Sequence, residues 1–352
     1  MIQKSFVVIA AAAMALAGVA PAPAQQVFPT AAQGVEELRA TRVLPLQGDP
    51  RAATPPVISA ISLSPDGQTF ATGGDDHVVR IWNLNDGKLV RQLRGHTDWV
   101  RAVVYNPKSQ VLATGADDHA ILYWDAATGQ KLRALAGPSQ VVYSLTFSQD
   151  GKLLAAAGFD AKVRLFDGAT GEPVRELIGP CADIRAVAFS PDGKLLAASG
   201  RDGRVRIWDY QTGQVLHDIA AHKQRVRALA FSADGGQLAS GGEDRFLRLW
   251  NPQTGAELLA ISSRPGKIQS LIYIGPDRLV TGASDNRIHI WDVKNGKEEA
   301  RLLGHTGSVS GLDYQAATGT LISSSFDTSV RIWNPPSTDG KVVEQNLNRT
   351  TR

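Results

Sequence analysis

Residues 75–88 read DDHVVRIWNLNDGK, and this stretch decides the fold. It begins with two acids, Asp75 and Asp76, continues through alternating apolar positions to Trp82, and ends in a turn that contains an Asp-Gly pair. Alternation of apolar and polar residues predicts a half-buried β-strand, and an Asp-Gly pair tolerates the backbone angles of a tight turn. The stretch therefore predicts one strand between two turns.

The same pattern returns along the chain at a constant period. It recurs as DDHAILYWDAATGQ from 117, FDAKVRLFDGATGE from 159, RDGRVRIWDYQTGQ from 201, EDRFLRLWNPQTGA from 243, SDNRIHIWDVKNGK from 284 and FDTSVRIWNPPSTDG from 326. The aromatic position of the seven copies is Trp82, Trp124, Phe166, Trp208, Trp250, Trp291 and Trp333. Successive copies are 42 residues apart, except for one spacing of 41. Such a period predicts a repeat architecture.

Each unit contains four short strand patterns. In the fourth unit these are IRAVAFS, KLLAASG, RVRIWD and QVLHDIA, and turn residues separate them. Asp-Gly and Thr-Gly pairs between apolar runs favour hairpins, because glycine adopts positive φ without a steric cost. Four antiparallel strands, repeated seven times, predict an all-β fold with the architecture of a seven-bladed β-propeller.

At these residues the chain resembles the WD40 repeat family, over about residues 41–334. The resemblance includes the Trp-Asp pairs, Gly-His at 95–96 and 304–305, and Ala221-His222 as a variant. Three units keep a full polar set at identical offsets: His96, Thr114, Asp118 and Trp124; His222, Ser240, Asp244 and Trp250; His305, Ser323, Asp327 and Trp333. The resemblance implies that each set, called a tetrad below, forms a hydrogen-bonded chain inside one blade.

An aspartate lies six residues before each aromatic position. The seven are Asp76, Asp118, Asp160, Asp202, Asp244, Asp285 and Asp327. A ring of carboxylates could suggest a metal site or acid–base chemistry. We favour a structural role instead, because Asp in a turn accepts hydrogen bonds from nearby backbone N–H groups. A radial repeat also spreads equivalent positions around a circle, so we predict no metal site. The tetrad histidines are expected to be structural donors, not metal ligands.

Small residues occupy one position of every first strand: Ala60, Ala102, Ser144, Ala186, Ala228, Ser270 and Gly311. In the family that the chain resembles, this strand lines the central channel, where seven strands crowd together. This level of the channel offers no side chain that could act as an acid, a base or a nucleophile. The chain also contains no supported nucleotide-binding, serine-hydrolase or zinc-protease motif. We therefore expect a protein without catalytic residues and without a cofactor.

The seventh unit needs a fourth strand from elsewhere. Residues 41–48, TRVLPLQG, match the fourth strand of the first unit in spacing, and we favour this N-terminal segment as the one that closes the ring. The alternative is the C-terminal segment 339–345, DGKVVEQ, which echoes residues 86–92. Residues 25–40 and 335–352 are expected to be extensions without a core of their own, and the second of them to be flexible.

In the family that the chain resembles, partners bind on the rim around one end of the channel. Two positions that flank the start of the first strand hold Trp99 and Arg101, Gln140 and Val142, Asp183 and Arg185, Arg225 and Arg227, Lys267 and Gln269, and Ser308 and Ser310. A third position, directly before the turn aspartate, holds Asp75, Asp117, Phe159, Arg201, Glu243, Ser284 and Phe326.

Basic and aromatic residues gather at these positions in the middle units. The predicted partner site consists of Trp99, Arg101, Phe159, Arg185, Arg201, Arg225, Arg227 and Lys267. Arginine and aromatic residues are enriched among interface anchors. The alternative interpretation is that solvated surface positions vary freely. We expect the charged members to be exposed, so that their replacement changes stability little.

The first 24 residues form a separate segment. Lys4 precedes an apolar run from Phe6 to Ala20, and Ala22-Pro23-Ala24 offers a cleavage site. This pattern predicts a cleaved secretory signal peptide of bacterial type, so we expect a periplasmic protein with no stable membrane insertion. Cys181 is the only cysteine in the sequence, which excludes an internal disulfide.

The sequence as a whole predicts a non-catalytic, protein-binding scaffold of the bacterial cell envelope. The formal net charge of +3 is too small to indicate nucleic-acid binding. Two alternatives stay open, which are a binder of a small anionic ligand at the channel mouth and an exported propeller enzyme with a site carried on loops.

We expect the mature protein to begin at Gln25, because the segment before it has the form of a cleaved signal. N-terminal sequencing of the protein purified from a periplasmic fraction measures this directly. Recovery of the uncleaved chain in salt-washed membranes would contradict the prediction.

Overall fold

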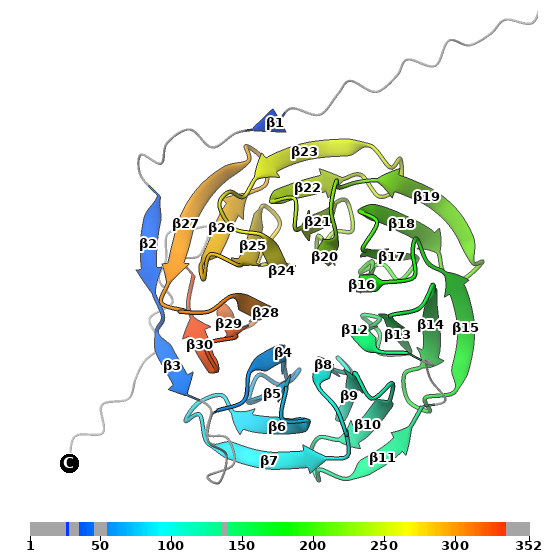
Figure 1. Cartoon of the computed structure of the whole chain (residues 1–352), viewed down its shortest axis with the longest axis vertical. Helices are drawn as coiled ribbons and strands as arrows, with labels where there is room; N and C mark the ends of the chain where they lie inside the picture. The colour runs from blue at the N-terminus through cyan, green and yellow to red at the C-terminus, as the bar shows by residue number, and fades with distance from the viewer. Residues whose placement is uncertain (1–25, 28–34, 46–54, 136–139, 336–352) are drawn as a thin grey trace, which may run out of the picture.

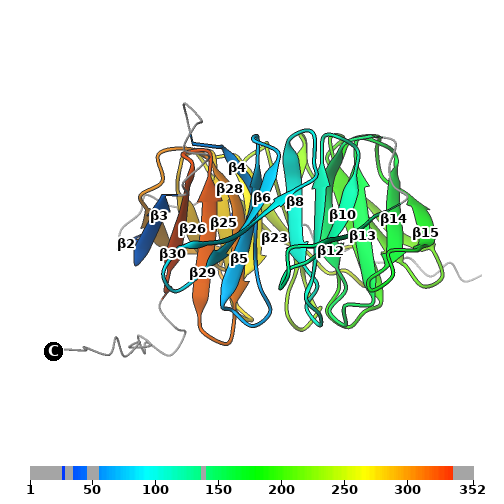
Figure 2. The same ribbon diagram turned by 90° about the horizontal axis from the view of Figure 1, so that it is seen from below.

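The computed structural model describes residues 26–27, 35–45, 55–135 and 140–335. Seven antiparallel sheets of four main strands each stand around a central axis like the blades of a propeller (Figure 1). Figure 2 shows the ring edge-on, with the strands of the blades side by side and the connecting turns at both ends. The predicted all-β, seven-bladed propeller is confirmed.

In each blade the strands are ordered from the axis outward. The first four blades contain β4 (Ile58–Leu63), β5 (Thr69–Gly74), β6 (Val78–Asn83) and β7 (Leu89–Arg94); β8 (Val100–Tyr105), β9 (Val111–Ala116), β10 (Ile121–Asp125) and β11 (Lys131–Ala134); β12 (Val142–Phe147), β13 (Leu153–Gly158), β14 (Lys162–Asp167) and β15 (Pro173–Ile178); β16 (Ile184–Phe189), β17 (Leu195–Gly200), β18 (Arg204–Asp209) and β19 (Gln214–Ala220).

The last three blades also receive strands from the N-terminal part of the chain. They contain β20 (Val226–Phe231), β21 (Leu238–Gly242), β22 (Phe246–Trp250), β23 (Glu257–Ser262) and β1 (Gln26–Val27); β24 (Ile268–Tyr273), β25 (Arg278–Ala283), β26 (Ile288–Asp292), β27 (Lys297–Leu303) and β2 (Glu36–Arg39); β28 (Val309–Gln315), β29 (Thr320–Ser325), β30 (Ser329–Trp333) and β3 (Arg42–Pro45).

The core lies between neighbouring blades. The seven repeated aromatic side chains are at most 4% exposed. Trp124 of the second blade, for example, belongs to one cluster with Ala71, Val79 and Ile81 of the first blade. Each blade therefore buries its apolar face against its neighbour, and the interior is a ring of interfaces between blades.

The N-terminal strand β3 closes the ring. It pairs antiparallel with β30, with Arg42 opposite Ile332 and Pro45 opposite Ser329. Leu44 is buried in the cluster that joins the seventh blade to the first. The predicted closure by residues 41–48 is confirmed for 42–45; residues 46–48 and the rival segment 339–345 lie outside the described residues.

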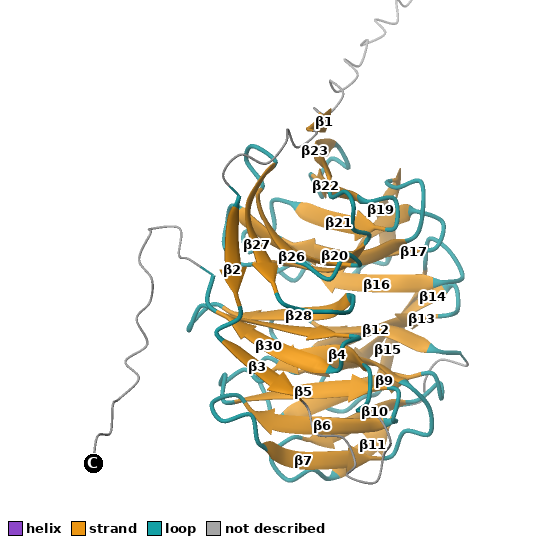
Figure 3. Ribbon diagram, turned by 60° about the vertical axis from the view of Figure 1, so that its left-hand side comes forward, coloured by secondary structure: helices purple, strands orange, loops and turns teal. Residues whose placement is uncertain are grey.

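Part of the predicted N-terminal extension belongs to the propeller, which corrects our picture of residues 25–40. β1 pairs in parallel with the outer strand β23, and β2 pairs in parallel with β27, with Glu36 opposite Ala300 and Arg39 opposite Leu303 (Figure 3). Leu38 packs against the core cluster of the sixth and seventh blades. The N-terminal segment thus runs along the outside of two blades before it completes a third.

Within the described part of the chain, no helix has the length and apolar character needed to cross a bilayer.

Replacement of Leu44 by alanine tests the ring closure. We expect it to lower the free energy of unfolding by about 2–5 kcal/mol, because the side chain fills the core between the last blade and the first. Val43→Ala is the matched control on the same strand, where the side chain is 47% exposed, and it should change stability by about 0.5 kcal/mol or less. Denaturant titration measures both; equal effects of the two substitutions would contradict closure by β3.

Candidate functional site

The four members of each predicted tetrad are joined by hydrogen bonds. In the second blade the Trp124 indole N–H donates to Thr114 Oγ1 over 2.8 Å, and His96 lies 2.7 Å from Thr114 Oγ1 through Nε2 and 2.9 Å from Asp118 Oδ2 through Nδ1. The fifth and seventh blades repeat the same contacts with His222, Ser240, Asp244 and Trp250 and with His305, Ser323, Asp327 and Trp333.

The tetrad of the second blade contains a neutral histidine and an ionised aspartate. Burial lowers the pKa of His96 and outweighs the opposing charge of Asp118. Burial by itself would raise the pKa of Asp118, but hydrogen bonds from the backbone of Thr97 and Ala120 and from His96 lower it. One proton arrangement satisfies every member: Trp N–H to Thr oxygen, Thr O–H to Nε2, and Nδ1–H to the carboxylate. The polar groups of the tetrad are therefore all engaged in hydrogen bonds that stabilise its blade.

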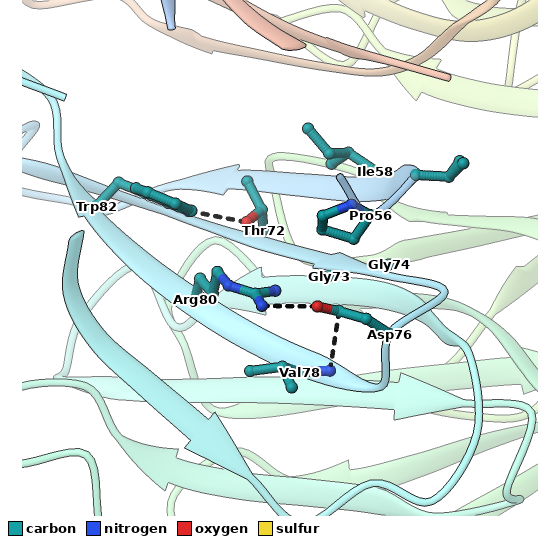
Figure 4. Close-up of a pocket in the computed structure, with 10 residues that line it drawn as sticks. Pro56, Ile58, Thr72, Gly73, Gly74, Asp76, Val78, Arg80 and Trp82 are labelled. Carbon is teal, nitrogen blue, oxygen red and sulfur yellow. Dashed lines mark hydrogen bonds and ion pairs between the residues drawn. The ribbon is translucent and has the colours of Figure 1, made fainter. Parts of the chain in front are cut away.

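Blades without the tetrad histidine hold the turn aspartate by other means. Figure 4 shows the first blade, where Arg80 pairs with Asp76 over 2.6 Å and the Trp82 indole donates to Thr72 over 2.9 Å. The Val78 N–H also donates to Asp76. The seven aspartates thus fix turns, as predicted, and no group of three or more His, Cys, Asp or Glu side chains in the described ranges could hold a metal ion.

The sixth blade uses a buried histidine between two carboxylates. His289 Nδ1 lies 2.6 Å from Glu298, and Nε2 lies 3.3 Å from Asp285. Arg301 pairs with Glu298 from the other side over 2.6 Å. Burial by itself would lower the pKa of His289, but its hydrogen bonds to Asp285 and Glu298 and the charges of both carboxylates raise it.

Every first strand has a β-bulge at its beginning. The bulged residues are Ser59, Arg101, Tyr143, Arg185, Arg227, Gln269 and Ser310. A bulge re-aims the side chain of the extra residue. Our assignment of Gln140 and Val142 to the third unit was wrong by one residue, since Val142 is a paired and buried strand residue and Tyr143 is the bulged one. Counting 42 residues from Arg101 would have found Tyr143.

One backbone hydrogen bond per blade ties the third rim position to the start of the first strand. The donors are the backbone N–H groups of Asp75, Asp117, Phe159, Arg201, Glu243, Ser284 and Phe326, and each acceptor is the carbonyl two residues before the bulged residue. The bulged residue and the third rim position are therefore placed alike in all seven blades. In two blades they form an ion pair: Arg101 with Asp117, and Arg227 with Glu243, each at 2.6 Å.

The middle blades carry a continuous network of charges. Asp183, only 4% exposed, pairs with Arg185 at 2.5 Å and with Arg225 at 3.3 Å. Arg225 directly precedes β20, so its pair with Asp183 links the fifth blade to the fourth, and it also pairs with Glu243 of its own blade at 3.2 Å. Burial by itself would raise the pKa of Glu243, but hydrogen bonds and charges from Arg227 and Arg225 lower it.

Aromatic rings support the same arginines. The Arg101 guanidinium lies 3.8 Å from the ring centre of Trp99, and the Arg185 guanidinium lies 3.5 Å from that of Tyr143. The Trp99 indole donates to Ser59 Oγ over 3.0 Å. The expectation that the charged residues are exposed is therefore wrong for four arginines, which are half-buried and paired: Arg101, Arg185, Arg225 and Arg227.

The remaining members of the predicted partner site are free to meet a partner. Phe159 is 46% exposed, and Arg201 is exposed. Neither Arg201 nor the half-buried Lys267 forms an ion pair with another described side chain. The structure thus divides the predicted set into a rigid, paired network and three groups that are available on its surface.

The innermost strands do contain one carboxylate, which the sequence analysis overlooked. Asp313 of β28 accepts a hydrogen bond of 2.7 Å from the Leu63 N–H of the first blade. Burial raises the pKa of Asp313 to about 6, against the hydrogen bonds from the backbone of Leu63 and Tyr314. Its contacts give it a structural role, because it joins the last blade to the first.

Comparisons with known proteins agree with the repeat pattern of the fold. The sequence model of the family described as "WD domain, G-beta repeat" matches residues 48–83, 87–125, 129–167, 171–209, 213–251 and 296–334. A similar protein is the "Uncharacterized WD repeat-containing protein alr2800" of Nostoc sp., 47% identical over 13% of this chain and 4% of that protein. Another is the "Probable serine/threonine-protein kinase PkwA" of Thermomonospora curvata, 42% identical over 12% of this chain and 6% of that protein. Both matches span a small part of the relatives' length.

The buried His289 gives the protein a measurable pH dependence. Because its pKa is raised in the folded state, its stabilising contribution is complete below the unfolded pKa of about 6.5 and is lost as the pH rises through the folded value. We expect His289→Gln to lower the free energy of unfolding by about 1–3 kcal/mol at pH 6, and by less at pH 9. A double-mutant cycle with Glu298→Gln, followed by denaturant titration at both pH values, measures the coupling. A coupling that does not fall with pH would contradict the prediction.

Proposed function

The chain belongs to the WD40 repeat family, and we propose that it is a non-catalytic, protein-binding platform of the bacterial cell envelope. The observation that carries the proposal is the rim network of the middle blades. Paired and stacked arginines form a preorganised surface there, on which Phe159, Arg201 and Lys267 remain available. Preorganised arginine and aromatic side chains are the usual anchors of protein interfaces.

The site chemistry favours binding over catalysis. The tetrad histidines form hydrogen bonds with the turn aspartates and the Thr or Ser hydroxyls of their own blades. The rim carboxylates Asp117, Asp183 and Glu243 are each held by arginine. A general acid must be able to donate a proton to the substrate and a general base to accept one from it, and these groups already have partners within the protein. An enzyme with a loop-borne site is the alternative that this argument disfavours.

A small anionic ligand at the channel mouth is a weaker candidate for the same reason. The arginines that the bulges place there are paired with Asp117, Asp183 and Glu243, so an anion would have to compete with carboxylates of the protein itself. A protein partner has no such difficulty, since it can use the exposed groups around the network. The periplasm is the compartment that we propose for this activity, on the strength of the N-terminal signal pattern.

The binding test replaces Arg201 and Lys267, the two rim cations that form no ion pair with a described side chain. Arg185 and Arg225 are unsuitable, because charge reversal there would leave the buried Asp183 beside new negative charge. We expect Arg201→Glu with Lys267→Glu to abolish capture of the main cross-linked partner from a periplasmic extract. Capture by the unchanged protein should weaken as salt rises, since exposed charge attraction is screened within roughly 8–10 Å.

The control is a pair that makes the same charge change at the opposite end of the ring, Lys152→Glu with Lys194→Glu. Both lysines lie in turns between first and second strands, and their side chains are 81% and 73% exposed. The control pair should keep capture. Equal loss in both pairs would show an effect of net charge, and loss in the control pair alone would move the site to the other end of the propeller; either result contradicts the proposal.

A further inference from the structure

We propose that a hollow between the third and fourth blades is the anchor pocket of the rim, and that it takes an extended acidic segment of a partner protein in which a large apolar side chain adjoins a carboxylate. The proposal rests on the function proposed above and names the chemistry of the partner. The hollow measures about 320 Å³ and is lined by Phe159, Cys181, Ala182, Asp183, Arg201 and Asp202.

The position of the hollow follows from the fold. Phe159 comes directly after β13, Cys181 and Ala182 lie in the loop between β15 and β16, and Arg201 comes directly after β17. All three segments lie at the end of the ring that carries the bulges. The hollow therefore adjoins the network of Arg185, Asp183 and Arg225 and shares Asp183 with it.

One side of the hollow is apolar. The exposed large apolar side chains of the described residues lie on the outermost strands, with two exceptions, Phe159 and Phe326. Of these two, Phe159 faces a hollow whose wall continues in Ala182 and Cys181. The Cys181 thiol donates to the Asp183 carbonyl, and burial raises its pKa, so it remains uncharged. An apolar side chain of a partner would cover Phe159 and remove it from water.

The other side of the hollow has a cation, Arg201, with which no carboxylate of the described residues pairs. The bulged residue and the third rim position form an arginine–carboxylate pair in the second and fifth blades. In the fourth blade the same two positions are both arginine, Arg185 and Arg201. Arg185 pairs with Asp183 and stacks on Tyr143, so Arg201 has no ion-pair partner in the part of the chain that the structure describes.

The local charge balance supports an acidic partner. Two arginines pair with Asp183, and Asp202 accepts a hydrogen bond from the Arg204 N–H; neither carboxylate forms an ion pair with Arg201. With the pair of Glu243 and Arg227 included, the four arginines Arg185, Arg201, Arg225 and Arg227 exceed the three carboxylates Asp183, Asp202 and Glu243 by one positive charge. A carboxylate from a partner would complete at Arg201 the pair that the second and fifth blades complete within themselves.

A peptide of the proposed chemistry tests the hollow. The probe is the capped, fluorescein-labelled peptide Gly-Ser-Asp-Phe-Glu-Ser-Gly, titrated with the full mature protein and followed by fluorescence polarisation. Two matched peptides replace Phe by Gly, or Asp and Glu by Asn and Gln. We expect the first peptide to bind with a Kd lower by about fivefold or more than either matched peptide.

Substitutions in the protein then locate the site. Phe159→Ala and Arg201→Gln should each raise the Kd of the first peptide by about fivefold or more, whereas Phe326→Ala should leave it within about twofold. Phe326 is the matched control, because it occupies the same position of the seventh blade and is 49% exposed. Cys181, the only thiol in the chain, supplies a second readout: the bound peptide should slow its reaction with a thiol reagent.

Three results would contradict the proposed pocket. The first is that the three peptides bind with equal affinity, and the second is that Phe159→Ala and Phe326→Ala change the Kd equally. The third is that N-acetyl-aspartate binds as tightly as the first peptide, which would indicate a site for small carboxylates. If Arg201→Glu with Lys267→Glu abolishes partner capture while Phe159→Ala leaves peptide binding unchanged, the platform function stands and the pocket fails. If capture is insensitive to the rim pair, the platform function fails first.

Discussion

The structure depends on the burial of one aromatic side chain per repeat against the preceding blade. A four-stranded sheet of this size cannot cover its own apolar face, so each unit is stable only beside a neighbour. The cluster around Trp124 draws residues from the first and second blades alike, and the cluster around Trp82 joins the first blade to the seventh. This requirement makes the ring close on itself. The chain meets it by placing β3 beside β30, with Leu44 in the last interface.

Two further devices set the geometry of the rim. The tetrads hold the loops before the first strands against the turns after the second strands, through contacts such as those of Asp118 with His96 and with the Thr97 N–H. The bulges then place one side chain per blade at the start of the innermost strand. The backbone at the start of the first strand is thus alike in all seven blades, and the side chains that it carries there differ from blade to blade.

Charges on this uniform frame differ from blade to blade. Where the bulged residue and the third rim position are arginine and carboxylate, the blade satisfies its own charges, as in the second and fifth blades. Where both are arginine, one cation must find a partner elsewhere, and Arg185 takes Asp183 while Arg201 takes none among the described residues. Half-buried pairs of this kind are screened less by salt than exposed charges, so they position the rim more firmly than a solvated cluster would.

The sequence by itself determined the number of blades, the strands of each blade and the tetrad members, and it favoured residues 41–48 over 339–345 as the closing strand. All of these follow from spacing, because residues at a fixed offset within a repeat occupy a fixed place within a blade. The repeat spacing also predicts Tyr143 as the bulged residue of the third blade, because it lies 42 residues after Arg101, but the position was assigned to Val142. Only the tertiary structure decided that Arg225 pairs across blades with Asp183, that Tyr143 stacks on Arg185 of the following blade, and that β1 and β2 lie in parallel along outer edges. These contacts join different units or free segments, and no repeat period encodes them; they depend on how adjacent blades are rotated and on which side chains that rotation brings within reach.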